Sequence, residues 1–316
     1  MDISIIIINW NTKDLLTNCI ESVYRTTKNL SFELWVVDNG SSDGSVMAVK
    51  NFYPLVNIIE NPHNLGFAKA CNQALRRING RYAVLLNTDT IVLDGTIETA
   101  LDFMKKNKNI GLCGGQLLNP DGSKQNSIAN IPTLATELLN KSLLRKLFPK
   151  KYPGKEHDFI NPIEVESIIG AFMIVRKEAI DDAGLMDEAY FFFFEETDWC
   201  MRMKNKGWRV VHHPDVKLYH LQGQSAKKVH IRARIEYWRS RYIFFKKHYG
   251  AASLVILKTG LLLKLLFSLT SNFLLAAATL FSSKKAIERS NLYFRLLSWH
   301  LSGLPDGYGL NTGEGR

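Results

Sequence analysis

Residues 3–12 read ISIIIINWNT, a run of β-branched residues that ends in polar ones. Such a run is typical of a strand that is buried on both faces of a sheet. Asn11 or Thr12 can cap a helix next, because apolar residues recur at helical spacing between Leu15 and Val23. A buried strand that leads directly into an amphipathic helix is the repeating unit of an α/β fold.

The same alternation continues outward from this stretch. It predicts strands at residues 34–37, 56–59 and 82–86 and a helix at residues 67–78. Alternating strands and helices imply a parallel sheet with helices on both faces. Polar clusters fall at the strand ends, at residues 9–12, 38–43 and 87–89. Since ligands of such sheets bind at the carboxyl ends of the strands, we expect the functional site there.

The second half of the chain has a different pattern. Residues 131–164 mix Pro, Lys and short Leu runs, which we interpret as a mobile insertion and a candidate lid. We then expect a strand at 168–175, a helix at 195–206, a strand at 208–212 and a basic, aromatic helix within 225–249. The predicted organisation is an α/β domain at 1–250, made of a nucleotide-binding half (1–118) and an acceptor half (119–250), and a helical tail at 251–316.

Composition limits the class of protein. The 316 residues are 46% hydrophobic and 22% charged, which excludes a mainly disordered chain. The formal net charge of +10 indicates an anionic partner: a nucleotide diphosphate, a lipid phosphate, a membrane surface or nucleic acid. The four cysteines lack CxxC spacing, so we expect reduced core residues. The first residues carry no basic region and their apolar run ends at Asn9, so we expect no signal peptide and a cytoplasmic catalytic part.

Two loops are candidates for binding a nucleotide. Asp38 ends a predicted strand and begins the stretch DNGSSDGS, whose glycines let the backbone turn closely around a ligand. Its carboxylate can accept hydrogen bonds from a base or a ribose, although an ordinary turn with a helix cap explains the pattern equally well. Asn64 and Gly66 precede a predicted helix whose N-terminus would favour a phosphate. A simple helix cap by Asn64 is the alternative.

A third stretch is a candidate metal site. Asp89 follows a buried strand within Asn87-Thr88-Asp89, where its carboxylate can hold Mg²⁺ or Mn²⁺ beside a diphosphate. His220 can complete such a metal shell, although a lone histidine is more often structural.

Acidic residues at 195–198 are candidates for acid–base chemistry. Glu196 shares a predicted helix face with the apolar Trp199, and an acid there is costly unless it has a function or a partner. Burial would raise its pKa toward the range of a general base. The alternative is that Glu195 and Glu196 only stabilise the helix N-terminus. Asp198 and Arg202 are four residues apart, so a surface ion pair explains both.

Together these segments resemble the family 2 glycosyltransferases, which have the GT-A fold and invert the anomeric configuration. Within that family they are most similar to the bacterial rhamnosyltransferase-like enzymes of surface-polysaccharide assembly. The resemblance runs from Ser4 to about Gly250. It is carried by the stretches 4–11, 38–45, 64–68, 87–89, 170–172 and 194–202. It implies an α/β, Rossmann-like GT-A domain that binds a nucleotide sugar.

The resemblance also implies roles for single residues. Asp38 would bind the donor nucleotide. The other donor-binding candidates are Asn9, Asn11, Asn39, Asn64, Gly66, Lys69 and Asn87. Asp89 would hold a divalent metal, Mg²⁺ or Mn²⁺, with His220 completing the site. Asn87 stands in the first place of the DxD metal motif, so Asp89 is the main metal ligand.

The same resemblance implies the chemistry. Glu196 would be the general base, where many relatives have Asp, and Glu195 and Asp198 are the further catalytic candidates. The QxxRW motif of processive synthases is absent, which favours transfer of one sugar. The implied donor is dTDP-L-rhamnose, with UDP-hexoses or UDP-N-acetylhexosamines as alternatives. The implied acceptor is a polyprenyl-diphosphate-linked saccharide of a cell-surface polysaccharide such as O-antigen.

Two other functions fit parts of the sequence. A sugar-nucleotide-synthesising nucleotidyltransferase also has a nucleotide-binding α/β sheet. It usually carries a Gly-rich, basic loop after the first strand, where this chain has Asn9-Trp10-Asn11-Thr12. A non-catalytic module that binds membranes or nucleic acid is suggested by the charge alone. We expect no nucleic-acid partner.

The stretch 251–281 is strongly apolar but contains Lys258 and Lys264. Its run at 265–281 is near the lower length limit for a spanning helix and has a polar middle. The whole stretch therefore predicts an interfacial helical hairpin whose flanking lysines meet anionic headgroups. We expect a peripheral or monotopic enzyme on the cytoplasmic face of the inner membrane. A soluble helical appendage packed on the catalytic domain is the alternative.

Overall fold

The computed structural model describes residues 1–28, 30–149, 159–221 and 230–310. The chain divides into two compact units: an α/β unit of residues 1–131 and 155–228, and a helical unit of residues 132–154 and 229–314. The sequence predicts the boundary at residue 250 instead. The boundary differs because one helix runs through residue 250 and because part of the insertion at 131–164 packs on that helix.

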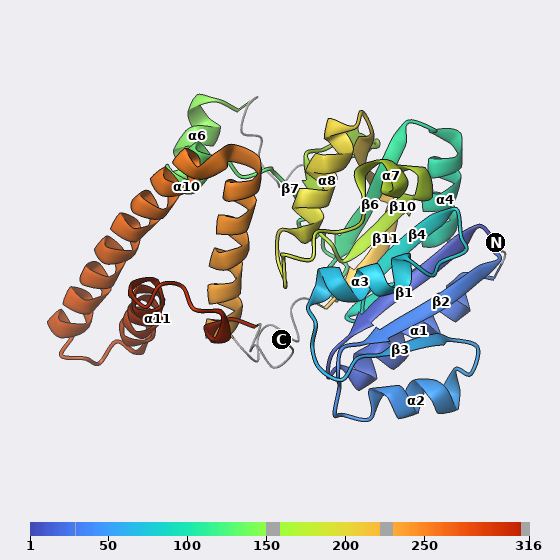
Figure 1. Ribbon diagram of the computed structural model, residues 1–316, viewed down its shortest axis with the longest axis horizontal. Coiled ribbons are helices and arrows are strands. Elements are labelled where there is room, and N and C mark those ends of the chain that lie inside the picture. The colour runs from blue at the N-terminus through green and yellow to red at the C-terminus, as the bar shows by residue number, and fades with distance from the viewer. Residues whose placement is uncertain (29, 150–158, 222–229, 311–316) are drawn as a thin grey trace. The chain divides into compact units, whose positions relative to one another are not determined.

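The α/β unit is built on one mixed sheet (Figure 1). Its strands are β1 (Ile3–Asn9), β2 (Phe32–Asp38), β3 (Asn57–Glu60), β4 (Tyr82–Asn87), β5 (Thr90–Val92), β6 (Ile110–Leu118), β8 (Ile163–Glu164), β10 (Phe172–Arg176) and β11 (Arg209–His220). They are ordered β3-β2-β1-β4-β10-β6-β11-β5, and β8 pairs with β11. A separate pair is formed by β7 (Ile128–Ala129) and β9 (Ser167–Ile168).

The prediction of a parallel sheet holds for the first half only. Strands β1, β2, β3 and β4 are parallel, but β10 is antiparallel to both of its neighbours, β4 and β6. Strand β5 is antiparallel to β11 because the chain reverses directly after β4. The sheet therefore keeps its parallel carboxyl edge at β1, β2 and β4, and other strands complete it.

Helices cover both faces of this sheet, as predicted. One face carries α1 (Lys13–Thr26), α2 (Ser45–Phe52) and α4 (Thr96–Lys106), and the other carries α3 (Phe67–Leu75), α7 (Lys177–Ala183) and α8 (Glu195–Asn205). The alternation of side chains along β1 explains this division, because Ile5 and Ile7 pack with α1 whereas Ile6 packs with α3. All four cysteines are buried and free, as the sequence predicts.

Three strands differ from the predicted pattern. Strand β6 was not predicted, because its Gly114 and Gly115 weaken a strand signal. Both glycines are needed there, since a Cβ on Gly115 would lie 2.5 Å from the carbonyl oxygen of Val216. The predicted strand at 168–175 is divided into β9 and β10 on either side of Gly170. Strand β11 continues to His220, so His212 and His213 lie inside it rather than at a strand end.

The helical unit consists of α5 (Leu134–Leu138), α6 (Lys141–Leu147), α10 (His230–Ala278), α11 (Lys284–Leu301) and the 3₁₀ turn η1 (Asp306–Tyr308). Helix α10 is broken at Gly250, whose φ of 78° is in the left-handed region (Figure 1). We call its two parts the first arm (230–249) and the second arm (251–278). The hairpin predicted within 251–281 is wrong, because the second arm is continuous to Ala278. The chain instead turns at 279–283 and returns as α11, which packs on α10.

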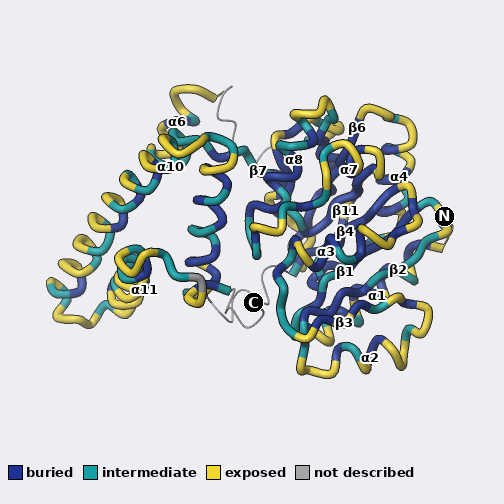
Figure 2. The backbone as a smooth tube through the Cα atoms, in the orientation of Figure 1, coloured by how far each residue is buried: buried dark blue, intermediate teal, exposed yellow. Residues whose placement is uncertain are grey.

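The second arm carries large apolar side chains on both its buried and its exposed faces. Its buried face carries Leu257, Leu261 and Leu265 at intervals of four residues. Its exposed large apolar side chains are Val255, Ile256, Leu263, Leu266, Phe267, Phe273, Leu274 and Leu275. Figure 2 shows exposed stretches along α10 in yellow. By length and composition the helix at 231–278 could cross a membrane, and only 17% of its most apolar window is buried. A long, unpaired apolar helix surface of this kind is unusual for a soluble monomer.

Candidate active site

Two loops at the carboxyl edge of the sheet are joined through the Asp38 carboxylate. Strands β1 and β2 pair Asn9 with Asp38. The Asn9 amide donates to Asp38 Oδ1 at 2.7 Å and to Ser41 Oγ at 3.0 Å, and the Ser41 amide donates to Asp38 Oδ2 at 2.8 Å. Asn11, with a φ of 52°, accepts from the Ser42 amide at 2.8 Å. The carboxylate is thus fixed in one orientation, with acceptor capacity left on each oxygen.

Asn39 has a structural position in the same edge. Its side chain is buried, donates to the carbonyl oxygen of Gly66 at 3.2 Å and accepts from Asn61 at 3.0 Å. Asn39 therefore joins the end of β2 to the start of α3. This geometry gives Asn39 a role in shaping the donor-binding loops, and direct contact with a nucleotide remains a prediction.

The end of β4 adjoins these loops. The register places Asn87 opposite Ile8 of β1, and the hydroxyl of Thr12 donates to that of Thr88 at 3.0 Å. The Asn87 backbone amide donates to the carbonyl oxygen of Ala171 at 3.1 Å. The Asn87 side chain is half-buried and hydrogen-bonds to none of the residues that the structure describes. It is therefore available to a ligand at this edge.

Asp89 and His220, far apart in sequence, lie face to face. His220 is opposite Thr90 in the β5–β11 pairing, and the Leu221 amide donates to the carbonyl oxygen of Asp89 at 2.8 Å. This register places His220 Nε2 at 3.4 Å from Asp89 Oδ1. Both side chains are almost entirely buried, so few water molecules can reach the space between them.

Gln125 fixes the tautomer of His220. The Gln125 amide nitrogen donates to the backbone carbonyl oxygen of His220, which leaves Gln125 Oε1 facing His220 Nδ1 at 3.0 Å. Nδ1 must therefore carry the proton, and in the neutral imidazole Nε2 presents a lone pair to Asp89. The preceding turn at 119–123 gave no sequence signal for this role, because Gln125 belongs to no recognisable ligand motif.

The pair fits a divalent cation. A carboxylate oxygen and an imidazole lone pair repel each other unless a proton or a cation lies between them. Two ligands at about 2.1 Å from one cation lie about 3.0–3.5 Å apart, which matches the observed separation. Among the described residues no group of three or more His, Cys, Asp or Glu side chains forms a metal cluster, so diphosphate or water oxygens would have to supply the remaining ligands.

The start of α3 is held by the protein itself. The Asn64 side chain accepts from the Gly66 amide at 2.9 Å, but the N-cap of α3 is Gly66, so the simple helix cap expected of Asn64 is not found. The Phe67 amide donates to the carbonyl oxygen of Phe191 at 2.7 Å. Two amides at this helix start are therefore already used. Lys69 is exposed on α3 and lies near enough to Glu188 to help lower the pKa of that carboxyl group.

The loop of four phenylalanines at residues 191–194 leads from the hydrogen bond between Phe67 and Phe191 into α8. Phe193 and Phe194 both have a φ of 70°, a left-handed conformation that costs energy for side chains of this size. Gly66 allows the close approach, since a Cβ there would lie 2.5 Å from the carbonyl oxygen of Phe191. Strained backbone directly before the acidic start of α8 indicates that the placement of those acids is functionally constrained.

Glu196 lies on the inner side of α8 beside Gly170. A Cβ on Gly170 would be 3.7 Å from the Glu196 side chain, so the glycine leaves that face open. Glu196 Oε2 is buried and has no hydrogen-bond partner in the described chain. Burial raises the pKa of Glu196 from 4.5 to about 7, although hydrogen bonds from backbone amides partly oppose the shift. The predicted pKa shift of this acid is therefore found, and its role as a base remains a prediction.

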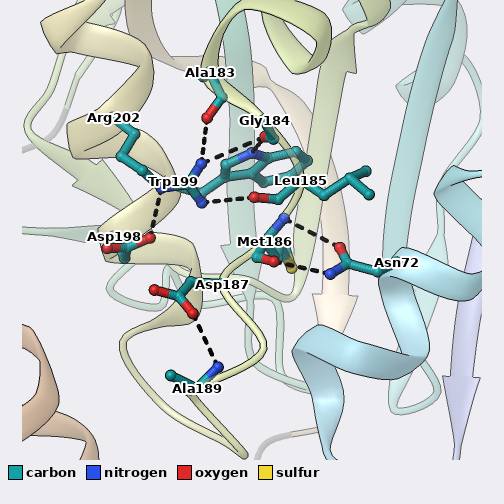
Figure 3. A network of polar contacts seen from close by, with 10 residues as sticks. All are labelled: Asn72, Ala183, Gly184, Leu185, Met186, Asp187, Ala189, Asp198, Trp199 and Arg202. Carbon is teal, nitrogen blue, oxygen red and sulfur yellow. Dashed lines mark hydrogen bonds and ion pairs between the residues drawn. The ribbon is translucent and has the colours of Figure 1, made fainter.

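Asp198 has a structural environment. Its side chain is fully buried and its Oδ2 accepts from Arg202 Nε at 2.7 Å, so the ion pair expected from the sequence is found, but it is buried rather than at the surface. Arg202 also donates to the carbonyl oxygens of Ala183 and Leu185, which fixes the loop after α7 (Figure 3). In the same network Asn72 of α3 pairs with the backbone of Met186. Asp198 therefore positions α8 rather than offering a free carboxylate.

Glu195 is also buried, but it faces a different element. Burial, and then the nearby Glu195 carboxylate, raise the pKa of the Cys71 thiol of α3 well above its ordinary value. Glu196 adjoins Gly170, and the next residue, Ala171, accepts from the Asn87 backbone amide. The structure thus gathers the predicted donor, metal and base residues along the carboxyl edge of one sheet.

Comparisons with known proteins agree with this arrangement. The family described as "Glycosyl transferase family 2" matches residues 4–184. An N-acetylglucosaminyl-diphospho-decaprenol L-rhamnosyltransferase of Mycobacterium tuberculosis is 26% identical over 231 residues, which are 68% of this chain and 75% of that protein. The dTDP-rhamnosyl transferase RfbF of Shigella flexneri is 29% identical over 181 residues, 55% of each chain.

A solved structure shows the same fold. The mannosyltransferase PcManGT from Pyrobaculum calidifontis, in complex with GDP-Man and Mn²⁺, superposes with a TM-score of 0.55 at 15% identity over 96% of this chain and 87% of that chain. The prediction of a GT-A glycosyltransferase fold is confirmed. The family match covers more than half of the chain and agrees with the edge described above: the chain belongs to glycosyl transferase family 2.

Proposed function

We propose that this glycosyltransferase is metal-dependent and inverting, and that it transfers one sugar from a nucleotide-sugar donor to a lipid-linked saccharide. The observation that carries the proposal is the pair of lone-pair-bearing atoms, Asp89 Oδ1 and His220 Nε2, at the edge that also holds Asp38. Such a pair favours a cation, and a cation at this edge would meet the diphosphate of a donor.

The residues at this edge of the sheet have separate roles in the proposed reaction. Asp38, held by Asn9 and the Ser41 amide, accepts hydrogen bonds from the donor nucleoside. A divalent cation held by Asp89 and His220 would neutralise charge on the departing diphosphate. Glu196 takes the proton from the acceptor hydroxyl, for which a pKa of about 7 is well suited. The acceptor oxygen then attacks the anomeric carbon opposite the leaving diphosphate, so the configuration inverts.

The proposed donor is dTDP-L-rhamnose and the proposed acceptor is a polyprenyl-diphosphate-linked saccharide. Support comes from two relatives, one named as an L-rhamnosyltransferase for N-acetylglucosaminyl-diphospho-decaprenol and one as a dTDP-rhamnosyl transferase. Such acceptors stay in the bilayer. The exposed apolar second arm supports a peripheral or monotopic enzyme, and we place it on the cytoplasmic face, where nucleotide sugars are made.

A donor panel tests this function. Purified full-length protein is incubated with a short-chain N-acetylglucosaminyl-diphospho-lipid, Mn²⁺ or Mg²⁺, and either dTDP-L-rhamnose, UDP-glucose, UDP-N-acetylglucosamine or GDP-mannose. We expect one rhamnose to be added from dTDP-L-rhamnose, with inverted configuration by NMR, and no product with EDTA. Transfer from another donor would contradict the rhamnose assignment, and full activity with EDTA would contradict the metal.

A further inference from the structure

A cluster of cationic and aromatic side chains in the helical unit plays no part in the edge described above. We infer that this cluster, centred on Arg241 and Lys258, binds the diphosphate group of a lipid-linked acceptor. The inference rests on the proposed function, because it names the place where that acceptor is recognised. All of the residues concerned lie in α5, α10 and α11 of the helical unit.

Arg241 is the centre of the cluster and has unused donors. It lies on the first arm, is only 6% exposed, and donates through Nη1 to Glu137 of α5 at 2.7 Å. Its Nε and Nη2 atoms are buried and have no hydrogen-bond partner among the residues that the structure describes. Leaving two such donors unpaired costs free energy, so a native arginine in this state indicates an absent acceptor.

The two unused donors lie on the same edge of the guanidinium group. Nε–H and Nη2–H point in parallel, and this fork matches two oxygens of one phosphate group. The guanidinium carbon lies 4.6 Å from the ring centre of Trp238 and 5.5 Å from that of Tyr237. These rings, together with the bond to Glu137, hold the fork in place before any ligand arrives.

Lys258 brings a second cation to the same place. It lies on the second arm, and its ammonium group is 5.2 Å from the ring centre of Tyr242. No ion pair or hydrogen bond joins Lys258 to another residue in the described part of the chain. A fork and a separate ammonium group suit the two phosphates of a diphosphate, one cation for each.

His300 of α11 reports the excess of positive charge. Its Nδ1 donates to the carbonyl oxygen of Leu296 at 2.7 Å, so its Nε2 accepts from the Tyr242 hydroxyl at 2.8 Å. Burial lowers the pKa of His300, the bond to Leu296 opposes this, and the charges of Lys258 and Arg241 lower the pKa further. The Glu137 carboxylate is shared between Arg241 and the exposed Lys141.

The neighbouring surface favours a lipid as the source of the diphosphate. Val255 and Ile256, three and two residues before Lys258, are 63% and 52% exposed, and the apolar surface of the second arm continues from them. An isoprenoid chain can lie along this surface while its diphosphate reaches Lys258 and Arg241. A free nucleotide has no apolar chain to bury on this surface, so the surface would not strengthen its binding.

The test uses the full-length protein in detergent with EDTA and with geranylgeranyl diphosphate as the probe, followed by tryptophan fluorescence. EDTA removes any metal-dependent binding at Asp89. We expect wild type and Asp89→Asn to bind the probe equally and Lys258→Gln to bind it about ten-fold more weakly. Arg241→Lys keeps the charge and the contact to Glu137 but loses the fork, so it should weaken binding while preserving the fold. Lys246→Gln removes an exposed charge of the first arm and should match wild type.

Two outcomes would overturn the inference. One is equal binding by Lys258→Gln and Lys246→Gln, and the other is displacement of the probe by phosphatidylglycerol at the same mole fraction, which would make this a phospholipid headgroup site. The binding assay needs neither a nucleotide-sugar donor nor sugar transfer. The probe can therefore bind when the donor panel shows no transfer, and transfer can be found when the probe does not bind.

Discussion

Asp89 Oδ1 and His220 Nε2 lie 3.4 Å apart, and Gln125 Oε1 lies 3.0 Å from His220 Nδ1, so a neutral His220 turns the lone pair of Nε2 toward Asp89. This relationship depends on sheet register: β11 pairs with β5 immediately after the chain turns at Asp89. Asp89 lies in a stretch that resembles the DxD metal motif, whereas His220 belongs to no such motif. In the proposed function, the two side chains would form half of a cation site and a diphosphate would complete the other half.

Removing the Asp89 charge should abolish metal-dependent transfer. We expect Asp89→Asn to lower kcat by about 10²-fold or more, because the leaving diphosphate loses its cation. The exposed Asp94, in the turn after β5, provides the matched control Asp94→Asn. Mn²⁺ binding followed by electron paramagnetic resonance checks the cause. If Asp89→Asn binds Mn²⁺ like wild type, the metal assignment is wrong.

Substituting Gln125 should weaken metal binding without removing a contact to the donor. Gln125→Leu removes the acceptor of the His220 Nδ1 proton, so the ring can turn or change tautomer. We expect Mn²⁺ affinity to fall about 10- to 100-fold while the donor KM at saturating metal stays near wild type. Asn126→Leu, a change at the exposed neighbouring position, is the control. Equal metal affinity in both variants would show that Gln125 is merely structural.

The raised pKa of Glu196 predicts the acidic limb of the pH profile. The base must be ionised, so kcat/KM should rise with pH through about 7 and then level. Glu196→Gln should lose about 10²- to 10⁴-fold in kcat while still binding the donor. A profile that rises near 4.5, the ordinary value for glutamate, would exclude the buried base.

The same carboxyl group links stability to pH. Its folded-state pKa is raised, so between 4.5 and about 7 the folded protein binds more protons than the unfolded chain. The free energy of unfolding should therefore fall as pH rises through this window and change little above it. Glu196→Gln should lack this part of the slope in denaturant titrations at pH 5 and pH 8. An identical slope in the variant would contradict the assignment.

Asp198 should behave as a structural acid. Asp198→Asn leaves the Arg202 charge buried without its partner, so we expect a loss of about 2–4 kcal/mol in unfolding free energy. At a temperature where the variant is folded, its transfer rate should stay within a few-fold of wild type. Loss of turnover without loss of stability would move the general base from Glu196 to Asp198.

Local patterns predicted much of this molecule. The β-branched run of β1, the helical spacing of α1 and the polar strand ends located the edge where Asp38, Asn87 and Asp89 gather. The remaining features depend on tertiary contacts, which local sequence patterns do not predict. Strand β6 contains glycines because Val216 approaches its backbone closely. This long-range contact cannot be predicted from the residues around β6 alone. Gln125 acts only through a histidine that β11 brings from far along the chain.

The site residues show the same limit. Sequence spacing suggested an exposed pair for Asp198 and Arg202, but the carbonyl oxygens that complete the Arg202 shell come from the loop after α7. The predicted boundary at residue 250 coincides with the helix break at Gly250, but the sequence pattern did not show that both arms belong to one helical unit. Such features depend on contacts between distant segments, which periodicity does not record.

The last prediction concerns the second arm, where Phe267 is 75% exposed. If this arm enters the membrane interface, Phe267→Glu places a charge in the lipid and should weaken binding to anionic vesicles about ten-fold. Phe52 of α2 is 73% exposed in the α/β unit, so Phe52→Glu makes the same change where no lipid contact is expected. Vesicle co-sedimentation of both full-length variants measures the difference. High salt should release only part of the wild type, because the apolar contribution is not screened. Equal sedimentation of Phe267→Glu and wild type would favour the alternative, a soluble helical appendage.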